Sequence, residues 1–558
     1  MKKYLIFLFL IFILGLGLRI YRLGEIPVGF HKDEAFLGYN AYSILKTGHD
    51  INGNFLPLHL KSFLYSPAGY SYFSIPFINI FGLSPFSVRF ASALFGSLTI
   101  LTTYFLVKNG LSQIGKRNNF DSLALLSAFL LAINPWHINL SRTATENTLV
   151  VFFISLGLFL YLAWIQKKKY YFLLISFLFF SITLFLYQAP RAFLPLFLPL
   201  FLILLPNLRK KELLQFFSLF LVLIIIPLSL IFSSKDLSLR IRTVSVFSTE
   251  QTQLLINQQI GEDGVAGTQN KITRIFHNKV LGYSSQILEN YFKHFSYTFL
   301  FTDQGLPERY KVPNIGLLYL IELPFLILGA WFLFKKDKKI AGLLLGWILL
   351  TPLGSALTFD DVPNLQRTLI IFPALTIIIA FGFLGFFSLI KGNFARRTLF
   401  FSVSFLLFFN VLFYLHEYYI HASVYRPWIR QEGYEELVAS VNKLLPDYKK
   451  AVITDRDSSP TIFFLLYGKY DPSLFQKQTK GTKMKDFDRI NFANYEFSQE
   501  QCPLTYIKKE GETTFTGEKN VLYVNSGLCD ENVGNTEVLR VIKRLDGSTA
   551  FRILKTIN

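Results

Sequence analysis

The sequence predicts an α-helical polytopic membrane protein of about eleven transmembrane helices, with extracytoplasmic loops and a small C-terminal α/β or α+β domain. Composition is the first reason, since 52% of the 558 residues are apolar and only 17% are charged, against roughly 25% charged residues in soluble domains. The second reason is that the apolar residues fall in blocks close to the roughly 20 residues that a helix needs to cross a bilayer core. The third is the distribution of lysine and arginine between the loops.

Eleven apolar blocks follow one another along the chain. They cover residues 4–20, 87–107, 120–137, 146–165, 170–187, 191–206, 213–233, 314–334, 340–357, 367–389 and 398–416. The block 191–206 is short and contains three prolines, which favour a kinked or partly re-entrant helix. Without this block, everything that follows it would lie on the opposite side of the membrane.

Basic residues alternate between the short loops that connect these blocks. With the N-terminus in the cytoplasm, most of these lysines and arginines are inside, and the short outer loops hold only Arg142, Arg191 and Arg367. Because basic loops resist translocation, we expect a multi-pass protein of the plasma membrane with a cytoplasmic N-terminus and an extracytoplasmic C-terminus. The inner loops also account for most of the net charge of +19, so nucleic acid is not an expected partner.

The blocks divide the chain into a transmembrane domain over residues 1–420 and an extracytoplasmic soluble domain over residues 421–558. Two long outer loops, residues 21–86 and 234–313, belong to the transmembrane domain. The soluble domain combines helical and strand-like patterns, which are typical of a small α/β or α+β fold. It contains both cysteines, Cys502 and Cys529, and the sequence leaves open a disulfide and two free thiols.

Two adjacent acids begin a helical pattern shortly after the first apolar block. Asp33 and Glu34 follow His31 in the stretch VGFHKDEAFLGYNAYSILKTGHD, residues 28–50. One interpretation is structural, with Asp33 as the N-cap of a helix that ends at Gly48. The other is a carboxylate at the membrane surface that accepts a proton from a hydroxyl nucleophile, or that orients a metal or a phosphate.

Four arginines lie near the outer ends of the predicted helices, namely Arg89, Arg142, Arg191 and Arg367. Each one alone is explained by a side chain that reaches toward lipid headgroups. Together with the acid pair on the same side, Arg142, Arg191 and Arg367 favour the binding of a phosphate, which the forked guanidinium group suits well. Arg89 is equally suited to anchor the end of its helix and to contact a substrate. A phosphate at this boundary is expected to belong to a lipid-linked substrate.

The chain resembles the GT-C class of membrane glycosyltransferases, in particular the bacterial family 39-like branch related to protein O-mannosyltransferases and aminoarabinose transferases. The resemblance covers roughly residues 1–420. Its motifs are DEA (33–35), GHDINGNFLPL (48–58), the stretch from YSPAGYSYF to ASALFGSLTI (65–100), NPWHINLSRTATEN (134–147), YQAPR (187–191) and NLQRTLIIFPAL (364–375). The C-terminal domain matches no family that we name.

The resemblance implies an inverting transfer of a sugar from a polyprenyl-phosphate donor to a hydroxyl acceptor on the extracytoplasmic face. Asp33 would be the general base, and Glu34 would support it or orient the acceptor. The leaving phosphate would be held by Arg191 and Arg367 with Arg142, and the further substrate-binding candidates are Arg89, Tyr187 and His31. The acceptor is a protein, a glycolipid or a cell-wall polymer.

No nucleotide cofactor is implied, and a divalent cation is left open. Four histidines lie on the expected outer side, His31, His137, His294 and His416, and a histidine with a carboxylate could hold such an ion. Two other functions compete with the enzyme. One is a transporter or flippase of lipid-linked sugars, which commonly has internal repeats, and the other is a non-catalytic scaffold in which Asp33 is only a helix cap.

Overall fold

The computed structural model describes residues 2–61, 65–115, 120–204, 208–233, 243–480, 489–509, 512–531 and 533–557. Lys116 and Arg117, two of the basic residues predicted for the inner loops, lie outside these ranges. The described chain divides into two compact units. The first comprises Met1–Arg19, Leu94–Ser141 and Glu146–Leu415, and the second comprises Ile20–Ala93, Arg142–Thr145 and His416–Asn558.

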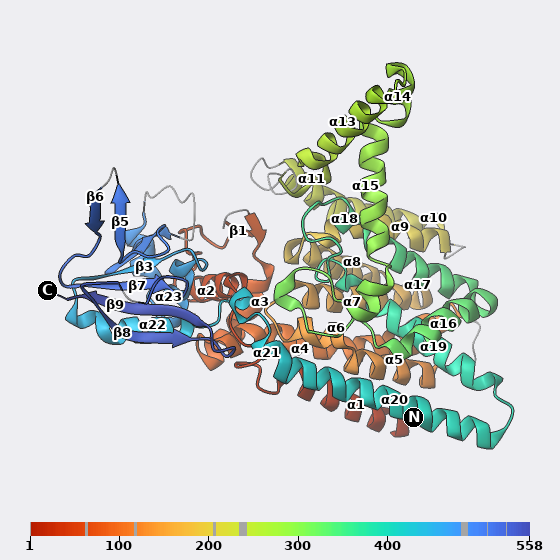
Figure 1. The fold of residues 1–558 in the computed structure, drawn as a ribbon. Coiled ribbons are helices and arrows are strands. Elements are labelled where there is room, and N and C mark those ends of the chain that lie inside the picture. Colours follow the sequence, from red (N-terminus) through yellow and green to blue (C-terminus); the bar gives the residue numbers. More distant parts are fainter. Residues whose placement is uncertain are drawn as a thin grey trace. The chain divides into compact units, whose positions relative to one another are not determined.

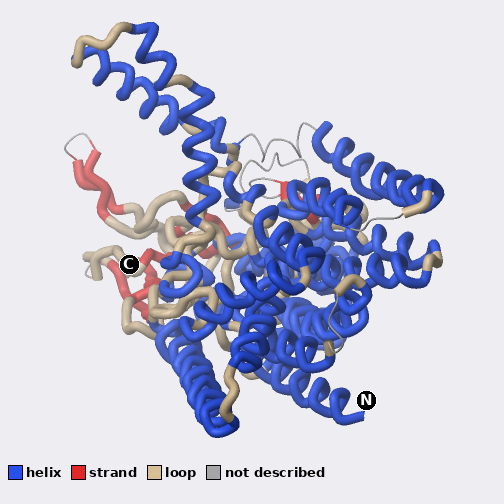
Figure 2. The backbone as a smooth tube through the Cα atoms, turned by 90° about the vertical axis from the view of Figure 1, so that its right-hand side faces the viewer, coloured by secondary structure: helices blue, strands red, loops and turns tan. Residues whose placement is uncertain are grey.

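Helices make up most of the first unit (Figures 1 and 2). The apolar ones are α1 (Lys2–Ile20), α4 (Pro85–Phe105, which begins in the second unit), α5 (Asp121–Ile133), α6 (Pro135–Ser141), α7 (Glu146–Lys167), α8 (Tyr170–Leu186), α9 (Ala189–Leu204), α10 (Lys210–Phe220), α11 (Ile226–Ser233), α16 (Leu323–Lys336), α17 (Lys338–Leu350), α18 (Leu353–Ala356), α19 (Ala374–Leu389) and α20 (Asn393–His416).

Each of the eleven predicted blocks contains helix, so the polytopic helical class is confirmed. In the described ranges, however, six helices are long and apolar enough to cross a membrane, or seven if the bent pair α5 and α6 forms one span. Helices α8, α9 and α19 are apolar but shorter. The structure therefore confirms a multi-span membrane protein. Fewer than the predicted eleven spans are reached when the described helices are judged by length and composition.

One predicted block begins later than expected. Residues 314–334 were predicted to be one helix, but α16 starts only at Leu323. The Tyr319 amide donates to Glu322 Oε2 at 2.9 Å, so the Glu322 side chain closes a capping box around a short 3₁₀ turn. Pro324 then occupies the first turn of α16, where the missing amide proton costs nothing.

Helices α16 and α19 pack closely through two glycines. A side chain at Gly329 of α16 would collide with the backbone carbonyl of Ile378, and one at Gly382 of α19 with that of Phe325. Small residues allow membrane helices to approach each other in this way, which increases van der Waals contact. The pair fixes how two of the predicted spans lie against each other.

A helical arm leads away from the rest of the first unit, as Figures 1 and 2 both show. It consists of α13 (Glu250–Val265), α14 (Asn270–Phe276) and α15 (Lys279–Lys293), all within the long outer loop predicted over residues 234–313. Ile256 of α13 packs against α15 at Gly282. The apolar side chains toward the far end of the arm stay exposed, among them Val265, Ile275, Phe276 and Val280.

The second unit contains the one described sheet that has three or more strands. Its five-stranded sheet has the order β4 (Tyr495–Ser498), β3 (Lys450–Thr454), β7 (Val521–Ser526), β9 (Thr549–Thr556) and β8 (Thr536–Lys543). Strand β3 is parallel to β4 and β7, whereas β9 is antiparallel to β7 and β8. Val452, Tyr523 and Leu554 of neighbouring strands pack in one hydrophobic cluster with Leu504 and Val521. The predicted strand-containing C-terminal domain is confirmed.

Helices and short hairpins complete this unit. They are α2 (Lys32–Thr47), α3 (Gly69–Phe81), α21 (Ala422–Val424), α22 (Tyr434–Leu444), α23 (Pro460–Tyr467) and α24 (Pro472–Gln478), with the hairpins β1 (His59–Lys61) to β2 (Tyr65–Pro67) and β5 (Tyr506–Lys509) to β6 (Glu512–Phe515). Cys502 and Cys529, which the sequence left open, form a disulfide in the structure.

The grouping differs from the predicted division at residue 420. The first outer loop belongs with the C-terminal residues, because α2 packs against α23 and α24. The Tyr39 hydroxyl donates to the carbonyl of Tyr470 at 2.8 Å, and Gln476 Nε2 donates to the carbonyl of Asp50 at 2.8 Å. The sequence could not reveal these contacts, since the partners are separated by more than 400 residues.

We expect Gly329→Val to destabilise the first unit. The added methyl groups would force α16 and α19 apart, at a cost of about 1–3 kcal/mol or more. Thermal unfolding of the detergent-purified protein would measure the loss. Gly17→Ala in α1 is the control, because a Cβ at Gly17 meets no atom within 4 Å; equal unfolding temperatures for the two variants would contradict the close packing.

Candidate active site

Helix α2 begins with a cap that the sequence assigned to a different residue. His31, not Asp33, is the N-cap, because its Nδ1 accepts from the Asp33 amide at 3.2 Å. Glu34 completes the capping box by accepting from the His31 amide at 3.4 Å. The helix ends at Gly48, as predicted, where the backbone adopts φ 72°. Asp33 is therefore not needed as the cap, and His31 is used by the helix rather than presented to a substrate.

The Glu34 carboxylate is buried, with 2% of its side chain exposed, and it collects donors from distant parts of the chain. Arg89 Nε donates to Oε2 at 2.9 Å, and Arg430 Nη2 donates to Oε1 at 2.9 Å. The amide of Ala144 donates to Oε2, also at 2.9 Å. All these residues belong to the second unit.

These contacts set the ionisation of Glu34. Burial opposes the charged form and is the largest influence, but the guanidinium groups of Arg89 and Arg430 outweigh it and lower the pKa of Glu34 to about 2. A carboxylate that binds two arginines and an amide stays charged. It is held by the protein, so Glu34 is suited to fix the start of α2 rather than to exchange protons with a substrate.

Asp33, the neighbour of Glu34, has the opposite environment. Its side chain is 54% exposed, with His31 Nδ1 3.4 Å from Oδ2. Successive residues on a helix point about 100° apart, so fixing Glu34 inward turns Asp33 outward. The structure thus separates the predicted acid pair into one buried structural carboxylate and one accessible carboxylate.

Two arginines that the sequence predicted to bind substrate are fully buried instead. Arg89 donates to Glu34 and to the carbonyls of Leu23, Pro27 and Gly29. Arg142 donates to the carbonyls of Tyr21 and Ile26 and to the Tyr418 hydroxyl. Both residues have 0% exposure. Their guanidinium groups thus donate to main-chain carbonyls and to the side chains of Glu34 and Tyr418.

The aromatic rings of Tyr418 and Tyr419 enclose Arg142 further. Their centroids lie 5.3 and 5.2 Å from the guanidinium carbon of Arg142, within the range of cation–π attraction. Neither tyrosine was singled out from the sequence. Nor was Arg430, whose distance of 396 residues from Glu34 along the chain leaves no local signal.

The other predicted residues come together in the first unit. Tyr187, Arg191 and Arg367 line one cavity of about 360 Å³. Polar side chains of Gln188, Ser245 and Thr358 also line it, beside apolar ones such as Phe232 and Phe247. Positive charge in a largely apolar cavity suits an amphipathic ligand with a phosphate.

Both arginines of this cavity are oriented by hydrogen bonds. Arg191 Nε donates to the carbonyl of Leu184 at 3.1 Å. Arg367 donates to the carbonyl of Asp360 at 2.8 Å, to Asp360 Oδ2 at 3.0 Å and to Thr358 Oγ1 at 2.6 Å. The side chain of Arg367 keeps 15% of its surface exposed. An anion in the cavity would therefore compete with Asp360 for this arginine.

The four histidines considered for a metal have separate surroundings. His31 caps α2, and His137 Nδ1 lies 2.9 Å from Arg19 Nη2. His294 contacts Ser355 Oγ and the Asn364 amide, and burial lowers its pKa to about 4. His416 alone lies beside a carboxylate and a second histidine, Glu417 and His421. The sequence reasoning missed His421.

The two units thus hold an accessible carboxylate at a helix start and an arginine-lined amphipathic cavity, in a chain of multiple membrane-spanning helices. Residues 66–232 match the family model described as dolichyl-phosphate-mannose-protein mannosyltransferase. The match includes Arg89, Arg142, Tyr187 and Arg191, and it confirms the predicted resemblance to GT-C glycosyltransferases over this segment.

Similar proteins were also found among curated sequences and solved structures. An uncharacterized protein of Aquifex aeolicus (strain VF5) is 29% identical over 170 residues, which are 30% of this chain and 31% of that protein. The chain aligns with the oligosaccharyltransferase AglB of Archaeoglobus fulgidus (TM-score 0.48, 14% identity, 83% of this chain, 63% of AglB). It also aligns with ArnT of Cupriavidus metallidurans (TM-score 0.49, 11% identity, 99% and 97%). Neither structure defines a residue role here.

We expect Glu34→Gln to cost about 3 kcal/mol of stability at neutral pH, because it leaves the Arg89 and Arg430 charges buried without their counter-ion. The folded pKa of about 2 lies below the ordinary 4.5. The contribution of Glu34 is thus complete above pH 4.5 and is lost as the pH falls toward 2.

Thermal unfolding of wild type and variant across this pH range would test the expectation. The gap between the two proteins should narrow steadily below pH 4.5. Asp33→Asn is the matched control, since an exposed side chain should change stability by no more than about 0.5 kcal/mol. A gap that is independent of pH would contradict the assigned ionisation of Glu34.

Proposed function

We propose that the protein is an integral membrane glycosyltransferase that transfers a sugar from a polyprenyl-phosphate donor to a hydroxyl acceptor on the extracytoplasmic face. The observation that carries the proposal is the exposure of Asp33 beside the anchored Glu34. The family match over residues 66–232 supports the donor class, because that family is named for transfer from a lipid phosphate sugar.

Asp33 is the general base in this proposal. Its carboxylate takes the proton from the acceptor hydroxyl while the oxygen attacks the anomeric carbon of the sugar. A bond forms between the acceptor oxygen and the anomeric carbon, and the bond between that carbon and the phosphate oxygen breaks. The polyprenyl phosphate leaves with the electron pair. A single displacement of this kind inverts the anomeric configuration.

The cavity that contains Tyr187, Arg191 and Arg367 is the phosphate site in this proposal. Charge grows on the phosphate as its bond to the sugar breaks, and fixed arginines stabilise that charge in the transition state. The apolar side chains of the cavity suit the first part of the polyprenyl chain. Arg89 and Arg142, which the sequence also suggested as substrate-binding residues, have no part in the phosphate site of this proposal, because their guanidinium groups donate to Glu34 and to main-chain carbonyls.

Other details rest on the sequence alone. The predicted topology places the C-terminus outside the cell, and the acceptor is a protein, a glycolipid or a cell-wall polymer. A transporter of lipid-linked sugars is the competing function, and it differs in needing no general base.

Asp33→Asn should reduce sugar transfer by at least about 100-fold, since positioned acid–base groups contribute roughly 10²–10⁴ to a rate. The fold should stay intact, because the cap is His31 and the Asp33 side chain is exposed. The measurement is transfer of radiolabel from a panel of polyprenyl-phosphate sugars by membranes with matched expression. Lys32→Ala, at the half-buried first residue of α2, is the control.

Three outcomes separate the functions. Transfer by the wild type and by Lys32→Ala, but not by Asp33→Asn, would support the base. Equal transfer by all three would remove Asp33 from the mechanism. Label that crosses the membrane in every variant without reaching an acceptor would instead favour the transporter.

Removing the charge of Arg191 or Arg367 should reduce the use of the donor more than it reduces the stability of the fold. We expect Arg191→Gln and Arg367→Gln each to lower kcat/KM for the donor by at least about tenfold, which corresponds to losing one charge-assisted hydrogen bond. Competition by polyprenyl phosphate in the same transfer assay gives the second readout. Arg274→Gln, on the exposed arm, should leave both values unchanged; a loss of equal size there would contradict the phosphate site.

A further inference from the structure

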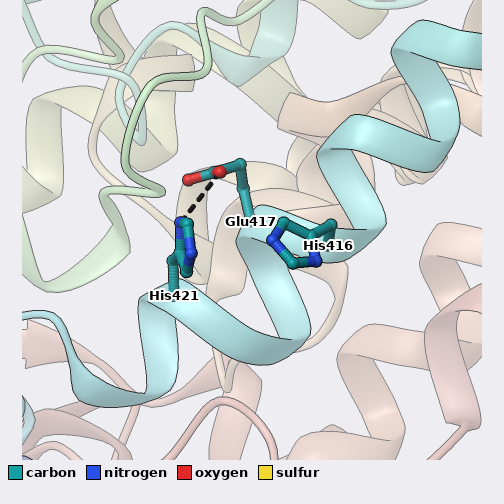
Figure 3. A group of neighbouring side chains, drawn as sticks. All are labelled: His416, Glu417 and His421. Carbon is teal, nitrogen blue, oxygen red and sulfur yellow. Dashed lines mark ion pairs between the residues drawn. The ribbon is translucent and has the colours of Figure 1, made fainter.

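The last apolar helix continues into an unusual turn that carries three metal-ligating residues. Helix α20 passes into the π-helical turn η9 (Glu417–His421). A π-turn is rare and often occurs at functional sites. Its wider winding places residues five apart on the same side, so His416 and His421 come close to each other, and the Glu417 carboxylate pairs with His421 (Figure 3).

Potential ligand atoms of the three side chains lie near one another. His421 Nδ1 lies 2.9 Å from Glu417 Oε1, and the rings of His416 and His421 have centroids 4.8 Å apart. One ligand atom from each residue lies within 4.8 Å of the others. The Glu417 side chain is only 2% exposed, whereas that of His421 is 48% exposed. The group thus combines one buried carboxylate with two imidazoles that are open to solvent.

We propose that His416, Glu417 and His421 bind a divalent transition-metal ion, with Zn²⁺ as the best fit. Two imidazoles and one carboxylate are a known ligand set for four-coordinate zinc, with a fourth position left for water. Bonds of roughly 2.0–2.2 Å to nitrogen and oxygen would draw the three ligand atoms together by rotation of exposed histidine side chains.

A simple ion pair accounts for only part of this arrangement. His421 and Glu417 alone would form one, as His277 and Asp263 do at 3.4 Å on the arm. The His416 ring is the additional feature, because it brings a second imidazole to the same carboxylate. This difference between the two pairs provides an internal comparison for the experiment.

The proposed ion would stabilise the turn that surrounds Arg142. Tyr418 and Tyr419 belong to η9, and their rings enclose the Arg142 guanidinium. Arg142 begins the short segment of the second unit in which the Ala144 amide donates to Glu34. A metal ion bound at η9 would therefore help to hold Arg142 and the Ala144 amide in place, and through them Glu34. The three metal ligands thus act as positioning residues. The inference does not depend on the reaction proposed for Asp33.

Metal binding by the full-length protein in detergent tests the proposal. After EDTA treatment and buffer exchange, the wild type is incubated with Zn²⁺ and desalted, and bound zinc is measured by inductively coupled plasma mass spectrometry. We expect about one equivalent per chain, a rise in the unfolding temperature with Zn²⁺, and, with Co²⁺, the visible absorption of a four-coordinate site. His416→Ala and His421→Ala should each lose the bound metal and the thermal shift, whereas His277→Ala should keep both.

Either of two results would overturn the proposal. One is a wild type that binds no zinc and shows no thermal shift. The other is a His416→Ala variant that binds zinc as the wild type does, because the pair of Glu417 and His421 would then suffice. The Glu417→Gln variant separates a loss of metal binding from a loss of folding. It should lose the Co²⁺ absorption spectrum, and its unfolding temperature without metal shows whether the chain has folded.

Discussion

The buried charge of Glu34 is the constraint on which the rest of the second unit depends. Taking a carboxylate out of water costs several kcal/mol, which is recovered only when its lone pairs are filled by well-placed donors. Here the donors are Arg89, Arg430, the Ala144 amide and, more weakly, the His31 amide. His31 caps the helix that contains Glu34, and the other three donors come from three separate places in the chain, so these must assemble around α2 before Glu34 can be buried.

This single requirement explains the position of Asp33. A helix that buries one residue turns the next one about 100° away, and here that next position reaches solvent. The exposed acid lies on a helix start that is held by charge, by a capping box and by the contacts of α2 with α23 and α24. An accessible carboxylate on a rigid element is what general-base catalysis needs.

Much of the fold could be predicted from composition and hydrophobic patterning. The helical blocks and the C-terminal domain follow from them, because apolar length and alternation are local properties. The helix boundaries could not be predicted in this way, because the late start of α16 depends on the Glu322 side chain folding back onto the Tyr319 amide. The grouping of the first outer loop with the C-terminal residues could not be predicted for the same reason, because the contacts of Tyr39 and Gln476 join residues that no local pattern connects.

Local sequence patterns had the same limit for the residues of the candidate site. Adjacency singled out Asp33 and Glu34, but it could not tell which of the two would be buried. Residue type selected Arg142 as a phosphate ligand and Arg89 as a substrate contact, although a guanidinium group that binds carbonyls looks identical in sequence to one that binds phosphate. Their partners in the structure, such as Tyr418 for Arg142 and Glu34 for Arg89, are known only after folding.

Arg367 differs from those buried arginines in a way that bears on its chemistry. It lines a cavity and already holds an anion, the carboxylate of Asp360, whose side chain is 37% exposed. In the proposed function a phosphate takes the place of the Asp360 carboxylate, whose side chain can turn toward water. Until then Asp360 keeps the guanidinium group of Arg367 oriented, so the proposed site is preorganised for an anion.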